Sequence, residues 1–199
     1  MVLNILSISD ENIQRLHANP KLILKVIYPG SKISSETNDL FSYLSKLLNL
    51  FLRLPKRNAV LSISLDPTIG EKIGLDLDKS WHGIQYLLTR TAWKGEFPAN
   101  FLISGTEIGD IDVGYGSAKA FSSAEVKKIH KYLAKITQEE LFKNYYPRKM
   151  MEAEIYPEIW DRAEEKEMNK RYLTDYFAAL KTFIEEVANR NLGIIIWLN

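Results

Sequence analysis

The chain contains no cysteine among its 199 residues. This absence excludes disulfides, zinc sites built from thiolates and a cysteine nucleophile. A chain of this length buries roughly 70% of the surface of its unfolded form, so it can be stable without a disulfide. Since the sequence shows neither a signal peptide nor a membrane span, we expect a cytoplasmic protein.

The chain also lacks an excess of charge of one sign, with 26 Lys and Arg against 25 Asp and Glu. Without a global field, neither nucleic acid nor an anionic membrane is expected as a partner. No apolar run approaches the roughly 20 residues of a membrane span. Residues 1–9 lack the basic and apolar regions of a signal peptide. With 46% hydrophobic and 26% charged residues, the composition is that of an ordinary globular protein, and we expect one domain over residues 1–199.

The beginning of the chain predicts a strand followed by two helices. Residues 2–8 alternate apolar and polar side chains, which favours a short strand. Ser9 or Asp10 can cap the helix that follows. Asn19 and Pro20 are the residue types of a second helix start, with Asn as the cap and Pro in the first turn.

Residues 31–68 predict a polar loop, a helix, a basic turn and a strand. Apolar side chains at helical spacing over 40–51 indicate the helix, and alternation over 61–65 indicates the strand. The basic residues of 53–57 favour a solvated turn, with a nucleic-acid patch as the alternative.

Two capping boxes mark helix starts in the second half of the chain. Ser122 pairs with Glu125 and Thr137 with Glu140, each Ser or Thr three residues before a Glu. The helix after Thr137 is expected to stop at Pro147. Residues 155–157 are expected to be extended, because the residue before a proline avoids helical backbone angles.

The end of the chain predicts the longest helix and a buried strand. Apolar side chains recur at helical spacing: Leu173, Phe177, Leu180, Ile184 and Val187. Asn191 or Gly193 can close this helix in the left-handed conformation. Residues 194–198 form an unbroken apolar run, typical of a strand covered on both faces. The predicted fold is a single α+β domain, with a small mixed sheet that includes the N- and C-terminal strands and is covered by helices.

Residues 75–121 hold the candidate site. A helix predicted over 78–93, capped by Asp78 or Ser80, has two distinct sides. One side is an apolar stripe assigned to the core: Trp81, Ile84 and Leu88. The opposite side carries side chains that can form hydrogen bonds: His82, Tyr86, Thr89 and Trp93. A buried polar group without a partner costs roughly 1–3 kcal/mol, so these groups need partners, either protein groups or a ligand.

Glycines mark a loop predicted over 104–117. Neither a Gly-Lys-Ser/Thr phosphate loop nor the dinucleotide-binding glycine pattern is present. The glycines favour a tight crossing into an extended segment over 115–121, and phosphate binding is the alternative.

The carboxylates of this region suggest two kinds of chemistry. Hard cations take several carboxylate oxygens, but the spacing matches no calcium loop, and a lone histidine is weak for zinc. We therefore predict no metal and no cofactor. Glu107 and Asp110 can instead form an acid–base pair if folding brings them to His82.

Two functions follow from these residues. The first is a non-catalytic binding or interaction module with a protein or small-molecule partner. The alternative is an enzyme acting on a small polar molecule, with His82 as acid or base and Glu107 as its partner. In either case the candidate ligand-binding residues are His82, Tyr86, Thr89, Glu107 and Tyr115.

Three segments resemble a known family. They are Lys79-Ser-Trp-His-Gly-Ile-Gln-Tyr-Leu-Leu-Thr, Ser117-Ala-Lys-Ala-Phe-Ser followed by Glu125-Val, and Met151 through Glu154-Ile-Tyr-Pro. Together they are similar to the YfbM-like family of bacterial proteins of unknown function. The chain departs from that family at its Met-Val-Leu start, where many members have Met-Gly-Met, and in its longer region over 31–68. The resemblance implies a small cytoplasmic α+β protein from bacteria, and it brings no activity or catalytic residue with it.

Overall fold

The computed structural model describes residues 1–28 and 73–199. The loop, helix, basic turn and strand predicted between residues 31 and 68 lie outside the described residues. In the described part of the chain, no helix is long and apolar enough to cross a membrane.

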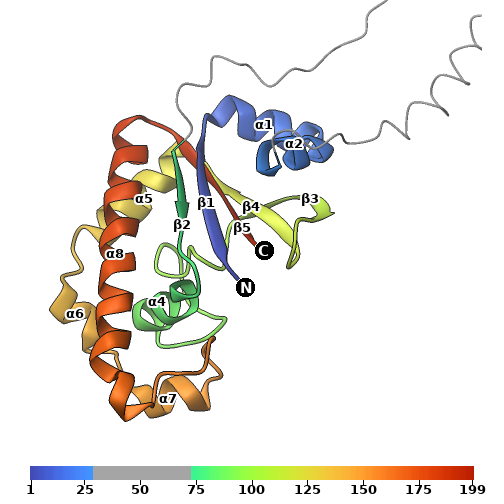
Figure 1. The fold of residues 1–199 in the computed structure, drawn as a ribbon. Helices are drawn as coiled ribbons and strands as arrows, with labels where there is room; N and C mark the ends of the chain where they lie inside the picture. Colours follow the sequence, from blue (N-terminus) through green and yellow to red (C-terminus); the bar gives the residue numbers. More distant parts are fainter. Residues whose placement is uncertain (29–72) are drawn as a thin grey trace, which may run out of the picture.

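Five strands of the described residues form one sheet. Their bounds are β1 Leu3–Ile8, β2 Gly74–Asp76, β3 Thr106–Asp112, β4 Ser117–Phe121 and β5 Gly193–Leu198. They lie in the order β2-β1-β5-β4-β3 (Figure 1), and every described pairing is antiparallel. The predicted α+β fold, with the N- and C-terminal strands in the sheet, is confirmed. The sheet is antiparallel rather than mixed, a property that the apolar pattern of single strands does not determine.

The strand β5 lies in the middle of the sheet, between β1 and β4. All of its residues pair with β1. Ile194 and Ile196 pack into the larger apolar cluster on one face of the sheet, and Ile195 packs into the smaller cluster on the other. Because both faces are covered, the strand has no solvent-facing side that would need polar residues. The prediction of a strand buried on both faces is therefore confirmed for this isoleucine run.

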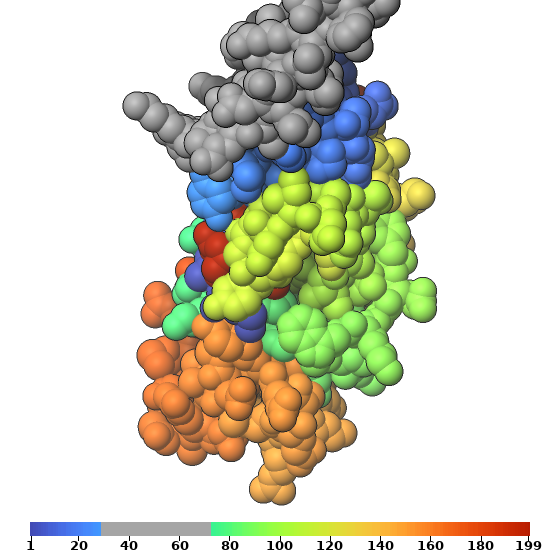
Figure 2. Space-filling model, turned by 90° about the vertical axis from the view of Figure 1, so that its right-hand side faces the viewer, coloured from blue at the N-terminus to red at the C-terminus, as the bar shows by residue number. Residues whose placement is uncertain are grey.

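The first helices cover the face of the sheet that Ile195 contacts. They are α1 Asp10–Ala18, the 3-10 helix η1 Pro20–Leu22 and α2 Ile23–Ile27. They adjoin the hairpin of β3 and β4, drawn in yellow-green beside the blue helices in Figure 2. Ser9 rather than Asp10 caps α1, because its hydroxyl accepts the Asn12 N–H at 3.3 Å. Asn19 precedes η1 without a side-chain capping bond.

The opposite face is covered by three longer helices (Figure 1). They are α4 Ser80–Thr89, α5 Ser123–Leu133 and α8 Lys166–Asn189. Both predicted capping boxes are present, one at α5 and one at the short helix α6 Gln138–Phe142. Asn191 adopts a φ of 56°, so it is the left-handed residue between α8 and β5.

Three predicted elements differ from the structure. Pro147 does not end α6, which stops at Phe142. Pro147 instead begins another helix, α7 Pro147–Glu152. Proline is tolerated there because the N–H groups of the first helical turn have no partner within the helix. Residues 155–157 form a turn rather than an extended segment, and the 3-10 helix η2 Ala163–Glu165 follows before α8. The loop predicted over 104–117 contains β3, whose alternation is masked by glycines and carboxylates.

The central strand gives the first prediction, for Ile195→Ala. Ile195 is fully buried, so truncation leaves a cavity in the smaller apolar cluster, and we expect a loss of about 2–5 kcal/mol of unfolding free energy. Chemical denaturation monitored by circular dichroism measures it. Lys128→Ala on the exposed side of α5 is the control and should change stability by less than about 0.5 kcal/mol. Equal stability of both variants would contradict the central position of this strand.

Candidate functional site

The helix α4, which carries most of the predicted site, is enclosed on nearly every side. From Ser80 to Leu87 each residue is buried. Gly83 permits this close packing, because a Cβ there would lie 2.8 Å from Leu173 of α8 and 2.9 Å from the Trp160 ring. The apolar stripe assigned to the core is confirmed for Trp81 and Ile84, which are both fully buried.

Neither predicted residue caps the start of α4. The N-cap position is Lys79, which makes no side-chain capping bond. The Ser80 hydroxyl donates to the Leu77 carbonyl at 2.6 Å, and the Asp78 carboxylate accepts from the Tyr172 hydroxyl at 2.8 Å. The helix ends at Thr89, so Trp93 lies beyond it.

His82 is held by backbone groups at both ring nitrogens. Its Nδ1 accepts the Tyr156 N–H at 3.1 Å, and its Nε2 lies 3.2 Å from the Ala92 carbonyl. Since Nδ1 is an acceptor, Nε2 carries the proton and donates it to that carbonyl. The ring packs against two aromatic side chains that also contact each other, with centroids 4.7 Å from Trp81 and 4.5 Å from Trp93. Protein groups thus supply the partners that a buried histidine requires.

Burial also changes the acid–base behaviour of this histidine. It lowers the pKa of His82 to about 4, although the Ala92 carbonyl favours the protonated form. The ring is therefore neutral at pH 7. A second proton on Nδ1 would face the Tyr156 N–H, so protonation breaks this contact.

The other two α4 residues of the predicted site are Thr89, which forms hydrogen bonds within the turn that ends the helix, and Tyr86, which is buried. The Thr89 hydroxyl donates to the Gln85 carbonyl at 2.8 Å and accepts the Thr91 N–H at 3.3 Å, so it is part of the turn that ends the helix. Tyr86 is 5% exposed, and burial raises its pKa, an effect that the nearby Arg90 guanidinium reduces.

Glu107 and Tyr115 lie on the β3–β4 hairpin. Glu107 is exposed and stands opposite Lys119 in the register. Tyr115 is 61% exposed, and its N–H donates to the Leu198 carbonyl at 3.1 Å. Gly114, with a φ of +145°, lets the hairpin turn approach the end of β5, because a Cβ there would lie 2.6 Å from the Leu198 oxygen. Gly114 therefore permits a close contact between backbones.

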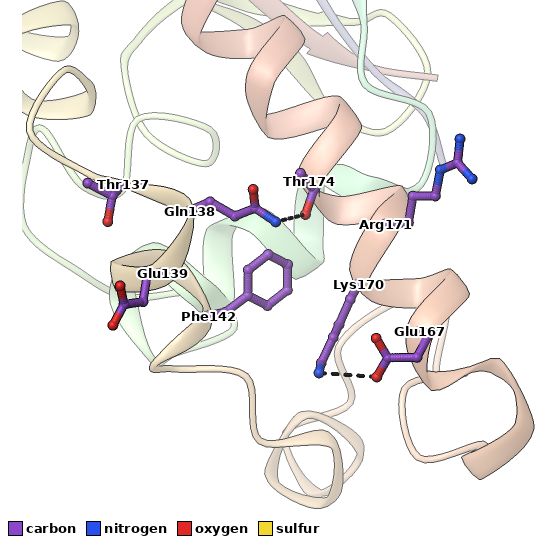
Figure 3. Close-up of a pocket in the computed structure, with 8 residues that line it drawn as sticks. All are labelled: Thr137, Gln138, Glu139, Phe142, Glu167, Lys170, Arg171 and Thr174. Atoms are coloured by element: carbon purple, nitrogen blue, oxygen red, sulfur yellow. Dashed lines mark hydrogen bonds and ion pairs between the residues drawn. The ribbon is translucent and has the colours of Figure 1, made fainter.

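A cavity of about 780 Å³ lies elsewhere, between α6 and α8, and we call it the α6–α8 groove. Figure 3 shows the residues that line it: Thr137, Gln138, Glu139, Phe142, Glu167, Lys170, Arg171 and Thr174.

Two hydrogen bonds hold the walls of this groove together at one end. Gln138 Nε2 donates to the Thr174 hydroxyl at 3.1 Å, and Lys181 Nζ donates to the Ile136 carbonyl at 2.9 Å. The capping box at Thr137 fixes the start of α6, so the wall opposite α8 is locally ordered.

The groove combines an aromatic side chain with charges of both signs. Phe142 projects toward the space between the two helices (Figure 3) and packs on Tyr145 with centroids 5.7 Å apart. Lys170 pairs with Glu167 at 3.3 Å. An exposed pair of this kind is worth about 0–1 kcal/mol, so both charges remain available to a ligand.

Sequence reasoning did not find this groove. The capping box at Thr137 and the apolar repeat of α8 located the two helices, but the groove is formed by their polar sides. Residues 137–142 and 167–174 come together only through the packing of both helices against the rest of the fold. Within residues 1–28 and 73–199, no three His, Asp or Glu side chains come close enough together to hold a metal ion.

The environment of His82 predicts a specific loss of stability in acid. The folded-state pKa of about 4 lies below the value of 6.5 expected in the unfolded chain, so the unfolded chain binds the proton first. The contribution of His82 is complete above about pH 6.5 and is lost as the pH falls toward 4, by about 3 kcal/mol in all.

Denaturation at a series of pH values measures this effect. In His82→Gln the loss of unfolding free energy between pH 7 and 4 should be smaller by about that amount, whatever the absolute stability of the variant. His17→Gln, at an exposed position of α1, is the control and should keep the wild-type profile. Parallel profiles for wild type and His82→Gln would show that folding does not lower the pKa of His82.

Comparisons with known proteins agree with this fold and leave the chemistry open. The model of the family described as a domain of unknown function, DUF1877, matches residues 1–197. The solved structure of YfbM from Escherichia coli, a protein of unknown function, is similar at a TM-score of 0.63 and 16% identity, with 98% of each chain covered. No curated protein matches the sequence. The resemblance to YfbM-like proteins is confirmed, and the chain belongs to the DUF1877 family of domains of unknown function.

Proposed function

We propose that the protein is a non-catalytic interaction module that binds a segment of a partner protein in the α6–α8 groove. The observation that carries this proposal is the groove itself. It is about 780 Å³ in volume, lies between two helices, exposes an aromatic side chain and has charged residues on both walls.

The groove suits a peptide segment with one apolar side chain and flanking charges. Phe142 is only partly buried, so an apolar side chain placed on it would remove further apolar surface from water. Lys170 and Arg171 on the α8 wall can form ion pairs with a carboxylate of the segment. Glu139 on the α6 wall can form an ion pair with a cation of the segment. The positions of these charges therefore determine the direction in which the segment runs along the groove.

The alternative is an enzyme for a small polar molecule at the predicted residues His82, Tyr86, Thr89, Glu107 and Tyr115. It has less support, because the ring nitrogens of His82 already hold backbone groups of Tyr156 and Ala92. Catalysis there would first require these contacts to open. Native mass spectrometry of the purified protein tests this alternative. A small molecule that the wild-type protein retains and the His82→Ala variant loses would favour it.

A crosslinking experiment tests the groove directly. Replacement of Phe142 by the photoreactive p-benzoylphenylalanine should crosslink the partner in cells, and mass spectrometry of the adduct identifies it. The affinity of the purified partner is then measured by calorimetry. Phe142→Ala should weaken binding by about tenfold or more, as expected for an aromatic anchor. Lys170→Glu should weaken it as well, by reversing the charge of the α8 wall.

Matched controls separate loss of the interface from loss of folding. Lys128→Glu makes the same change of charge on the exposed side of α5, outside the groove, and should leave the affinity unchanged. Thermal unfolding of each variant shows whether it is folded. If the crosslinked partner binds Phe142→Ala and Lys170→Glu as tightly as wild type, the groove is not its binding site.

A further inference from the structure

Another cavity lies between the end of α4, the end of α5 and α6, and we call it the Tyr132 pocket. Its volume is about 370 Å³, which is at the lower end of the range for small-molecule sites. Four aliphatic side chains line it: Leu87, Leu88, Ile136 and Leu141. Leu88 and Ile136 are only partly buried, so an apolar ligand placed on them would remove further apolar surface from water.

Three polar side chains of the Tyr132 pocket have no hydrogen-bond partner in the part of the chain that the structure describes. They are the Tyr132 hydroxyl and the ammonium groups of Lys135 and Lys143, which also take part in none of the ion pairs found there. Tyr132 is half-buried, and burial raises the pKa of its phenol, so its hydroxyl remains a hydrogen-bond donor at pH 7. The pocket thus presents donors whose acceptor would come from a ligand.

The other polar groups of the pocket are already engaged. Asn144 Nδ2 donates to the Leu87 carbonyl at 2.7 Å, and Asn144 Oδ1 accepts the Arg90 Nε–H at 2.6 Å. Glu140 Oε2 accepts the Thr137 N–H at 2.8 Å in the capping box of α6, and this bond lowers the pKa of the Glu140 carboxyl. The capping box therefore holds the carboxylate toward the start of α6, where the backbone N–H groups balance part of its charge.

Cations outnumber carboxylates around this pocket. Lys135 and Lys143 line it together with one carboxylate, that of Glu140. Arg90 adds a third cation at the rim, because it is hydrogen-bonded to another lining residue. The neighbouring Glu139 lines the α6–α8 groove instead. An apolar floor with a cationic rim is complementary to a molecule that has an apolar body and one negative charge.

We propose that the Tyr132 pocket binds a small apolar monocarboxylate, such as a medium-chain fatty acid. The carboxylate pairs with Lys135 and Lys143 and accepts the Tyr132 hydroxyl, since charge-assisted hydrogen bonds are the strong ones. The hydrocarbon chain covers Leu88 and Ile136. A phosphate or a dicarboxylate fits less well, because its further charge would face either the apolar floor or the Glu140 carboxylate. The pocket shares no lining residue with the α6–α8 groove, so this inference stands independently of the function proposed for the groove.

A heteronuclear NMR titration of the full-length protein tests the proposal with octanoate as the probe. The amide signals that shift most should belong to residues 87–88, 132–136 and 140–144, and the titration gives the Kd. Butanoate lacks four of the methylene groups of octanoate, so it should bind about tenfold more weakly or less tightly still. Octanol, which has a similar chain without the charge, should also bind about tenfold more weakly.

Charge-removing variants locate the carboxylate. The double variant Lys135→Gln, Lys143→Gln should weaken octanoate binding about fivefold or more, and it should keep the fold because both side chains are exposed. The control is Lys21→Gln with Lys128→Gln, which removes the same charge at exposed positions outside the pocket and should bind as wild type does. Phe142→Ala should bind octanoate normally, which separates this pocket from the groove.

Three results would overturn the proposal. One is the absence of shifts at millimolar octanoate. Another is a set of shifts centred outside the Tyr132 pocket, for example on the residues of the α6–α8 groove. The third is octanoate binding that is no tighter than that of octanol, or that the Lys135→Gln, Lys143→Gln variant retains in full, since the cationic rim would then have no part in recognition.

Discussion

The pairing of β1 with β5 determines the rest of this structure. It joins segments nearly the whole length of the chain apart and leaves both faces of β5 apolar. One face requires the layer of α1, η1 and α2, and the other requires α4, α5 and α8. A helix in either layer is stable mainly through the apolar surface it buries against the sheet, since short helices are marginal in water. Each layer therefore depends on the central pairing more than on its own helix propensity.

Enclosure of α4 follows from this arrangement and explains its polar residues. The helix lies against α8, and Gly83 allows Trp160 and Leu173 to come within contact distance. Polar groups enclosed in this way lose their water, so the fold must supply their partners. The backbone groups of Tyr156 and Ala92 do so for His82. The polar side chains opposite the apolar stripe of α4 thus predicted the burial of this helix correctly. They did not by themselves indicate a ligand, because protein groups can be their partners.

Much of the fold could be predicted from the sequence, because several signals are local. A capping box such as Ser122 with Glu125 needs only residues three apart, and the isoleucine run of β5 shows burial on both faces without knowledge of its neighbours. Pro147 was misjudged because proline ends one helix and begins another with equal ease, and only the position of α6 distinguishes the two. The α6–α8 groove could not be predicted. Most of its residues are polar, they match no binding motif, and they face each other only after two helices have packed on a shared core.

The partly exposed aromatic rings of Phe142 and Tyr146 have their physical origin in the short helices that follow α5. The helix α6 has five residues and α7 has six, so each presents only one or two side chains to the core. Leu141 is the buried residue of α6 and Met150 that of α7. Phe142, which follows Leu141, and Tyr146, which precedes α7, find too little protein to cover them and stay partly exposed. In the long helix α8, by contrast, Phe177 and Phe183 are buried. The sheet and its long helices therefore provide stability, while the short helices keep aromatic and charged side chains where a partner can contact them.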